Sequence, residues 1–285
     1  MSNRIVALVD GSIYSESVCR HAAWLAGHLS VPVELLHVLG RRETSETGDL
    51  SGAIGLGART ALLNELSELD RQRAKLGKMR GHAILDDARA IIQAENGATV
   101  TPRLLRGDLV EIMEAEEQKG LRAIVIGKRG EGADFARGHL GSNLERIARV
   151  THAPLLVASR AFLPVSKVLV AYDDSPSAQA AIGRIATSPV FAGLEMTLVH
   201  AGAETPPLRK AMQQAARQLD HAGLPTRIRF IEGEPEDALV KCVHAENFDL
   251  LVMGAYGHSR IRSLIIGSTT SAMMRAVKIP VLLFR

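Results

Sequence analysis

The stretch AIVIGKRG at residues 123–130 recurs as LLVMGAYG at residues 250–257. Each copy is a short apolar run, typical of a buried parallel strand, that leads directly into two glycines separated by two residues. A Gly-Ser pair, at 141–142 in the first copy and 267–268 in the second, then precedes a helix-like segment. A buried strand followed by a glycine turn and a helix is a βα unit, so this repeated motif predicts an α/β fold with parallel strands.

The repetition extends outward from this motif over almost the whole chain. Four more pairs of segments match: RIVALVDGS (4–12) with KVLVAYDDS (167–175), ELLHV (34–38) with TLVHA (197–201), LLRGD (104–108) with FIEGE (230–234), and LGSNLERIARVTHAPLLVA (140–158) with IGSTTSAMMRAVKIPVLLF (266–284). Matched residues lie 163 positions apart in the first two pairs and 126 apart in the last two, so the first half has 37 extra residues between His37 and Gly107. We therefore expect two tandem domains, 1–160 with a helical insertion at about 41–95, and 161–285.

Five apolar runs in each half predict five strands. The expected strands lie near 4–10, 32–38, 99–105, 122–127 and 154–158 in the first half, and near 167–173, 195–201, 226–231, 249–254 and 280–284 in the second. Helix-like stretches separate them, and strands that alternate with helices form open parallel sheets. The sequence thus predicts two five-stranded parallel sheets in tandem, with helices on both faces.

Composition and charge limit the classes of function. The chain has 285 residues, of which 46% are apolar and 23% charged, as in a folded globular protein. The formal net charge of +3 is too small to indicate a nucleic-acid or membrane-binding surface. No apolar run is long enough to span a membrane, and the apolar residues before Asp10 are too few for a signal peptide. Two cysteines cannot form a disulfide framework, so we expect a cytoplasmic protein.

Three features of each half fall where a parallel sheet binds ligands, beyond the carboxyl ends of its strands. An aspartate, Asp10 or Asp173, ends the first strand, the glycine pair ends the fourth, and the Gly-Ser pair opens the next helix. Glycines let backbone N–H groups approach an anion, and a serine at a helix N-terminus adds a hydroxyl where the helix dipole attracts phosphate. The aspartate can accept hydrogen bonds from a ribose or a base. These residues predict a phosphate site in each half, and a glycine turn without a ligand is the alternative.

The spacing of the second glycine motif resembles the ATP-binding signature of the universal stress protein family. The motif reads Gly254-x-x-Gly257, nine residues, then Gly267-Ser268, and the terminal strand PVLLF at 280–284 fits the same family. The resemblance covers both halves apart from the 37 extra residues. It implies the adenine-nucleotide alpha-hydrolase-like fold, with strand order 3-2-1-4-5 in each domain. It also implies pairing of the two domains through their last strands, an intramolecular pseudo-dimer, and we keep a homodimer as a further option.

The resemblance also implies roles for individual residues. Asp173 would meet the adenosine end of ATP, Ala201 the adenine through its backbone, and the phosphates would be held by Gly254, Gly257, Gly267, Ser268 and the hydroxyl of Thr269. The equivalent set in the first half is Asp10, Val38, Gly127, Gly130, Gly141 and Ser142. ATP is the expected cofactor, with Mg²⁺ as a candidate companion, and no metal ligand is assigned.

The first half departs from the signature. Ten residues instead of nine separate Gly130 from Gly141, and they include Glu131 and Asp134, whose charge opposes a triphosphate. Lys128, Arg129 and Arg137 offset that charge. The second half has no acidic residue in this segment and carries Arg260 and Arg262. We therefore expect the better ATP site in the second half.

Other chemistries find little support. The chain has no G-x-x-x-x-G-K-[ST] motif, no G-x-G-x-x-G motif and no cluster with zinc spacing, and nothing resembles a nucleophile–base pair. His37 and His200 are equivalent residues at the end of the second strand, either packed there or near the ligand. We expect a nucleotide-binding sensor of the stress response rather than an enzyme. The alternatives are an interaction scaffold without ligand and a slow ATPase.

The 37 extra residues begin with a Gly-rich apolar run, followed by a helix-like stretch from about 58 to 95. Gly77 and Gly81 are candidate kinks in this helix. It either packs along its own domain or forms an arm or lid for a partner chain or a second ligand. We predict that loop 50–57 covers part of the first ATP site or packs against a second chain.

Overall fold

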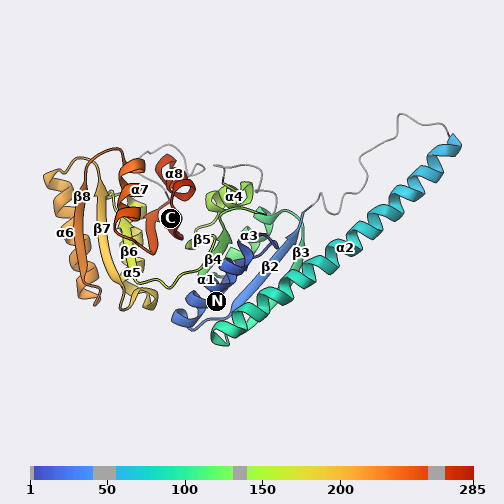
Figure 1. Cartoon of the computed structure of the whole chain (residues 1–285), viewed down its shortest axis with the longest axis horizontal. Helices are drawn as coiled ribbons and strands as arrows, with labels where there is room; N and C mark the ends of the chain where they lie inside the picture. Colours follow the sequence, from blue (N-terminus) through green and yellow to red (C-terminus); the bar gives the residue numbers. More distant parts are fainter. Residues whose placement is uncertain (1–2, 41–55, 131–139, 256–266) are drawn as a thin grey trace.

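A computed structural model of the chain describes residues 3–40, 56–130, 140–255 and 267–285. Its strands form a single ten-stranded sheet of order β3-β2-β1-β4-β5-β10-β9-β6-β7-β8. Each half of this sheet has the predicted order 3-2-1-4-5, so the expected α/β architecture is confirmed (Figure 1).

All ten expected strands are present, with bounds that differ from the expected ones by a few residues. They are β1 (Ile5–Leu8), β2 (Val33–Leu39), β3 (Val100–Arg106), β4 (Ala123–Gly127), β5 (Leu155–Ala158), β6 (Lys167–Ala171), β7 (Glu195–Ala201), β8 (Thr226–Ile231), β9 (Leu250–Gly254) and β10 (Val281–Phe284). Within each half, neighbouring strands are parallel.

The two halves join where their last strands meet. β5 and β10 pair antiparallel, with Leu156 opposite Leu282 at the centre of the junction. Every residue of both strands is buried, because helices cover both faces of the sheet. The predicted pairing of the two halves through their last strands is confirmed, and the pairing removes two apolar edges that would otherwise be open.

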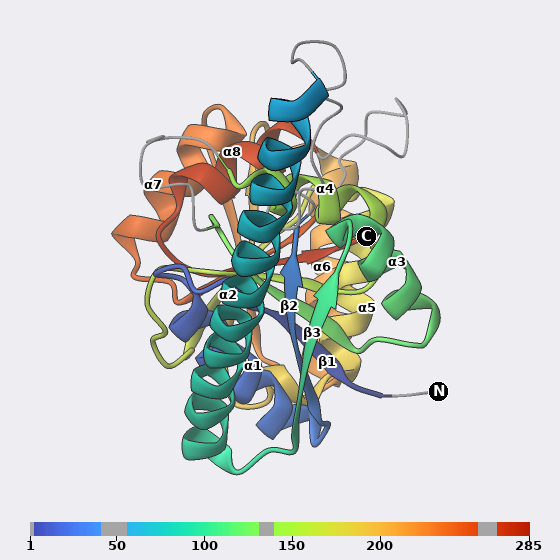
Figure 2. The same ribbon diagram turned by 90° about the vertical axis from the view of Figure 1, so that its right-hand side faces the viewer.

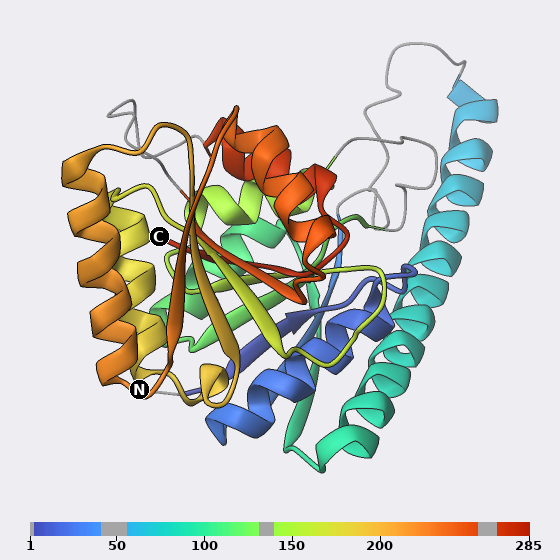
Figure 3. The ribbon, with the colours of Figure 1, turned by 60° about the vertical axis from the view of Figure 1, so that its left-hand side comes forward.

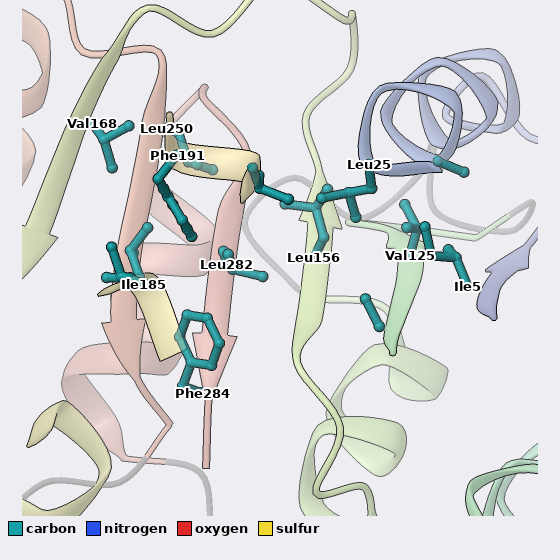
Figure 4. Close-up of a cluster of buried hydrophobic side chains, with 14 of the residues drawn as sticks. Ile5, Leu25, Val125, Leu156, Val168, Ile185, Phe191, Leu250, Leu282 and Phe284 are labelled. Atoms are coloured by element: carbon teal, nitrogen blue, oxygen red, sulfur yellow. The ribbon is translucent and has the colours of Figure 1, made fainter. Parts of the chain in front are cut away.

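The helices form a layer on each face of the sheet. One layer contains α1 (Ser15–Leu29), α2 (Leu56–Asn96), α5 (Pro176–Thr187) and α6 (Pro206–His221), and the other contains α3 (Leu109–Gln118), α4 (Ser142–Val150), α7 (Pro235–Ala245) and α8 (Ser268–Ala276). A short 3-10 helix, η3 (Pro189–Phe191), joins the first layer. The apolar core beneath each layer runs through both halves, as the labelled side chains from Ile5 to Phe284 show for the first (Figure 4).

The extra residues of the first half include α2, a helix of 41 residues. Its C-terminal part packs on α1, β2 and β3 (Figures 2 and 3), whereas its N-terminal part projects from the body of the molecule (Figure 1). The expected helix is therefore present and its C-terminal part packs along its own domain, whereas a role of the projecting part toward a partner chain or second ligand stays a prediction. Residues 50–55 of the predicted loop lie outside the described ranges. α2 is too polar to cross a membrane, and the other helices in the described ranges are shorter than a membrane span.

The two glycines proposed as kinks both lie inside α2, which continues through them. Gly81 is buried where α2 meets the sheet: a Cβ atom there would lie 2.6 Å from Leu104 Cδ1 and 3.0 Å from His37 Cδ2. Gly77 has open space around it. Gly81 thus permits close approach of the helix to the sheet.

A buried ionic cluster fastens α3 to the first half of the sheet. Arg4 and Arg103 each contact Glu34 of β2 and Glu116 of α3, with Arg4 Nη2 2.6 Å from Glu116 Oε2. Burial opposes ionisation of Glu116, but hydrogen bonds from Lys119 and Arg103 outweigh it and hold the pKa of this carboxyl below its usual value. The second half has Thr197 and Cys242 at the two glutamate positions, so this cluster is not required by the shared fold.

Candidate functional site

Each half has a cavity at the carboxyl ends of its central strands, where the strand order reverses. Cavity 1, in the first half, has a volume of about 490 Å³. Its polar lining comes from Asp10, Ser12, Tyr14, Ser15, His37, Arg129, Ser142 and Asn143, and it is also bordered by Val38, Gly127, Gly130 and Gly141. Leucines, valines and an isoleucine complete the wall, so cavity 1 has an apolar body with a few convergent polar groups.

Asp10 is held in place two residues after the end of β1. Its Oδ1 accepts hydrogen bonds from the Ser12 backbone N–H (3.0 Å) and the Ser15 hydroxyl (3.3 Å). A Cβ atom at Gly130 would lie 3.0 Å from Asp10 Oδ2. The missing side chain of Gly130 therefore lets the loop after β4 lie against the Asp10 carboxylate.

The first turn of α4 forms the opposite side of cavity 1. Gly141 is the N-cap residue and no side chain caps this helix, whereas Asp108 caps α3 and Ser175 caps α5. The Gly141 N–H donates to the Lys128 carbonyl at 3.2 Å, which ties the helix start to the glycine loop. An uncapped helix N-terminus presents backbone N–H groups and the positive end of the helix dipole, both of which favour an anion.

The two strand-end histidines occupy equivalent places. His37 Nδ1 lies 2.7 Å from the Val9 carbonyl, and His200 Nδ1 lies 2.9 Å from the Tyr172 carbonyl, so in each ring Nδ1 carries the proton and donates it. Both rings also line their cavities. The two interpretations of these histidines are therefore compatible, since each is packed by a hydrogen bond and borders the site.

Cavity 2, in the second half, is built from equivalent elements and its described part has a volume of about 210 Å³. Asp173 Oδ1 accepts from the Ser175 N–H at 3.0 Å, as Asp10 does from Ser12. The N-cap of α8 is again a glycine without a side-chain cap, and its N–H donates to the Ala255 carbonyl at 3.2 Å. The remaining polar lining includes Tyr172, His200, Ser268, Thr269 and Thr270.

The structure brings the sequence-predicted residues together in these two cavities. Cavity 1 is lined by Asp10, Val38, Gly127, Gly130, Gly141 and Ser142, and cavity 2 by Asp173, Ala201, Gly254, Gly267, Ser268 and Thr269. Gly257 lies outside the described residues, as do Glu131, Asp134, Arg137, Arg260 and Arg262.

Lys128 and Arg129 were both expected to offset the acidic charge of the first half, but only Arg129 lies at the cavity. Arg129 lines cavity 1, whereas the Lys128 ammonium donates to the Val277 carbonyl at the end of α8 in the other half. Burial, together with the smaller effect of the Arg129 charge, lowers the pKa of Lys128 to about 8. Lys128 therefore joins the two halves, and among the described residues Arg129 supplies the positive charge of cavity 1.

Sequence reasoning missed several lining residues that the internal repeat already indicates. Ser12 and Ser175 are 163 positions apart, and both contribute the N–H that holds the site aspartate. Asn143, in cavity 1, is the equivalent of Thr269. Adding 163 to Ser12 and 126 to Asn143 gives these equivalent residues, whereas the glycine pairs after the fourth strands are 127 positions apart.

One difference between the halves concerns the residue after the site aspartate. The backbone there has φ of 75° at Gly11 and 62° at Asp174, a conformation that favours glycine. The Asp174 carboxylate accepts hydrogen bonds from the Tyr172 hydroxyl and the Gln179 amide, both at 2.9 Å, and Asp174 does not line cavity 2. Burial and Asp174 together raise the pKa of Tyr172. The Asp174 carboxylate thus stabilises the loop after β6 through these hydrogen bonds.

Comparison with known proteins finds universal stress proteins that are similar to this chain along nearly its whole length. A model of the universal stress protein family matches residues 1–159 and 201–285. A universal stress protein of Synechocystis sp. is 38% identical over 99% of both chains, and one of Mycobacterium tuberculosis is 25% identical over 99% of this chain and 96% of its own. A crystal structure of a universal stress protein from Archaeoglobus fulgidus, 20% identical, has the same fold, with a TM-score of 0.72 over 100% of this chain and 99% of that one.

Proposed function

Since this chain belongs to the universal stress protein family, we propose that it is a stress-response sensor whose two cavities each bind one ATP molecule. The observation that carries the proposal is the repeated geometry: two cavities, each between an anchored aspartate and a glycine-capped helix N-terminus. A helix N-terminus without a side-chain cap suits a phosphate, and an aspartate suits ribose hydroxyls.

The arrangement supports one orientation of the nucleotide. Asp10 and Val38 would contact the adenosine, and the α4 N-terminus with Ser142 would contact the phosphates, with Arg129 adding a positive charge. In cavity 2 the corresponding residues are Asp173, Ala201, Ser268 and Thr269. The volume of cavity 1 lies within the ~300–1,000 Å³ usual for small-molecule sites.

Tighter binding in the second half stays a prediction. It rests on the extra residue and the acidic Glu131 and Asp134 of the first half and on Arg260 and Arg262 of the second, all in segments outside the described residues. Within the described residues, cavity 1 is the larger and carries Arg129. Measuring the ATP affinity of each cavity separately therefore shows which cavity binds ATP more tightly.

We also propose that binding, rather than hydrolysis, is the function. The described lining of each cavity offers one carboxylate, Asp10 in cavity 1 and Asp173 in cavity 2. The carboxylate of the neighbouring Asp174 accepts hydrogen bonds from Tyr172 and Gln179. The described residues contain no cluster of three or more potential metal ligands, so a Mg²⁺ ion would take most of its ligands from phosphate oxygens and water.

The test places a negative charge at each helix N-terminus. Ser142→Asp and Ser268→Asp suit the helix dipole, so the fold should keep its stability, but the carboxylate should repel a phosphate. We expect isothermal titration of the nucleotide-free protein with ATP to give two sites for the wild type, one for each single variant and none for the double variant. The loss of affinity at a changed site should be at least about 100-fold.

Ser142→Asn and Ser268→Asn are the matched neutral controls, and both should keep ATP binding. The interaction scaffold predicts no binding by the wild type and no nucleotide released on heating the purified protein. Binding that survives in the double Asp variant would refute the proposed site even if ATP binds elsewhere.

A further inference from the structure

The N-terminal part of α2 projects from the body as an arm, which we define as residues 62–80 (Figure 1). Three leucines of the arm, Leu62, Leu69 and Leu76, follow one another at intervals of seven residues and have exposed fractions of 37%, 44% and 64%. Leu66 lies between the first two, three to four residues from each. Residues at alternating spacings of three and four form the apolar seam by which helices pair in coiled coils.

The arm also has a sharp division of charge. Residues 62–70 contain Glu65, Glu68 and Asp70 and no basic residue, whereas residues 71–80 contain Arg71, Arg73, Lys75, Lys78 and Arg80 and no acidic residue. The acidic segment therefore carries three negative charges and the basic segment five positive charges.

The two segments meet at an ion pair within α2, Arg71 Nη1 to Glu68 Oε2 at 3.7 Å, but the helix dipole does not explain their division. The helix dipole acts within the first and last turns, and the basic segment ends sixteen residues before Asn96, the last residue of α2. Beyond the arm the pattern changes, because Gly81, Leu85, Ala88 and Ile92 are buried against the body. The exposed leucines Leu62, Leu69 and Leu76 thus lie N-terminal to the part of α2 that packs on the body.

We propose that the arm binds the arm of a second copy of this chain as an antiparallel helix pair. With the two-fold axis beside residue 71, Leu66 of one arm lies level with Leu76 of the other. The acidic segment of each copy then lies along the basic segment of its partner, with Glu65 near Lys78 and Glu68 near Lys75.

The charges of the arm favour a second copy of the chain as its binding partner, and they favour the antiparallel orientation. A parallel pair would place acidic beside acidic and basic beside basic, which is repulsive. A nucleic acid would be attracted to the basic segment but repelled by the acidic one. An antiparallel copy complements both segments at once and covers the leucines.

The first test removes the apolar contact. In the full-length protein, Leu69→Ser with Leu76→Ser should weaken self-association, measured by analytical ultracentrifugation, by at least about 100-fold. The matched control is Leu163→Ser, which changes a leucine that is 68% exposed outside the arm and should leave the association unchanged. Both variants should keep the wild-type circular dichroism spectrum, because the replaced leucines are exposed and lie outside the core. A wild type that stays monomeric, or a leucine variant that remains dimeric, overturns the proposal.

The second test uses charge reversal. Replacing Glu65, Glu68 and Asp70 by lysine should abolish dimerisation, since each arm is then basic along its length. Adding Arg71→Glu, Arg73→Glu, Lys75→Glu and Lys78→Glu to the same chain makes the first segment basic and the second acidic, with Arg80 as its remaining cation, and should restore dimerisation. Failure of this seven-fold variant to dimerise, with the helical content of the protein retained by circular dichroism, contradicts pairing by charge complementarity.

Discussion

At the scale of single residues, His21 is an unusual member of the core. It is fully buried on α1, where Nδ1 lies 2.7 Å from the Ser17 carbonyl, and Nε2 has no hydrogen-bond partner among the described residues. Its ring packs edge-on against Phe162 in the segment between the two halves, with ring centroids 4.9 Å apart. Burial lowers the pKa of His21 to about 4, and the hydrogen bond to Ser17 offsets this only partly.

This pKa gives a prediction for the pH dependence of stability. In the unfolded chain a histidine has a pKa of about 6.5, so between pH 6.5 and 4 the unfolded state binds more protons and stability falls as the pH falls. His21→Phe should remove up to about 3 kcal/mol of that dependence, measured as the free energy of urea unfolding against pH. His28→Phe, an exposed change on the same helix, is the control; equal slopes for wild type and His21→Phe would show that His21 does not contribute.

At the scale of elements, the same substitution at two glycines of α2 should change the stability of the fold by very different amounts. Gly81→Val places new methyl groups where Leu104 and His37 already contact the helix, so it should destabilise the fold by about 2 kcal/mol or more. Gly77→Val has open space and should change stability by no more than about 0.5 kcal/mol. Urea unfolding measures both, and similar effects at the two positions would refute close packing at Gly81.

Most of the helices and strands could be predicted from the sequence, because both halves contain the same order of apolar runs and glycine motifs. The glycine turns and Gly-Ser pairs placed α4 and α8 correctly, and the two site aspartates followed from the repeat. The role of Gly81 could not be predicted, since its neighbours Leu104 and His37 are distant in sequence and α2 has no counterpart in the second half. The exposure of Leu69 could not be predicted either, because an apolar helix stripe has the same sequence pattern whether a sheet or a second chain covers it.

At the scale of the whole molecule, contacts across the junction join the two halves. The Lys128 ammonium donates to the Val277 carbonyl at the end of α8, and Arg285 donates to the Arg149 carbonyl at the end of α4 at 3.0 Å. Each helix that opens at a candidate phosphate site therefore has its far end held by the other half. No motif signals these contacts, because the two cations are not equivalent residues of the repeat.

The junction predicts how the halves behave when they are separated. A cut after Phe162 keeps that residue with His21 and leaves β5 of fragment 1–162 and β10 of fragment 163–285 as unpaired edges, all of whose residues are buried in the intact chain. Such apolar edges favour pairing with another strand. Each purified fragment should therefore self-associate in light scattering, and a mixture should form a one-to-one complex through the β5–β10 register, with Leu156 opposite Leu282. Arg285→Ala in the second fragment, which removes the contact to Arg149 but no strand residue, should weaken that complex without abolishing it. A fragment that remains a stable, folded monomer would show that the shared sheet edge is not what holds the two halves together.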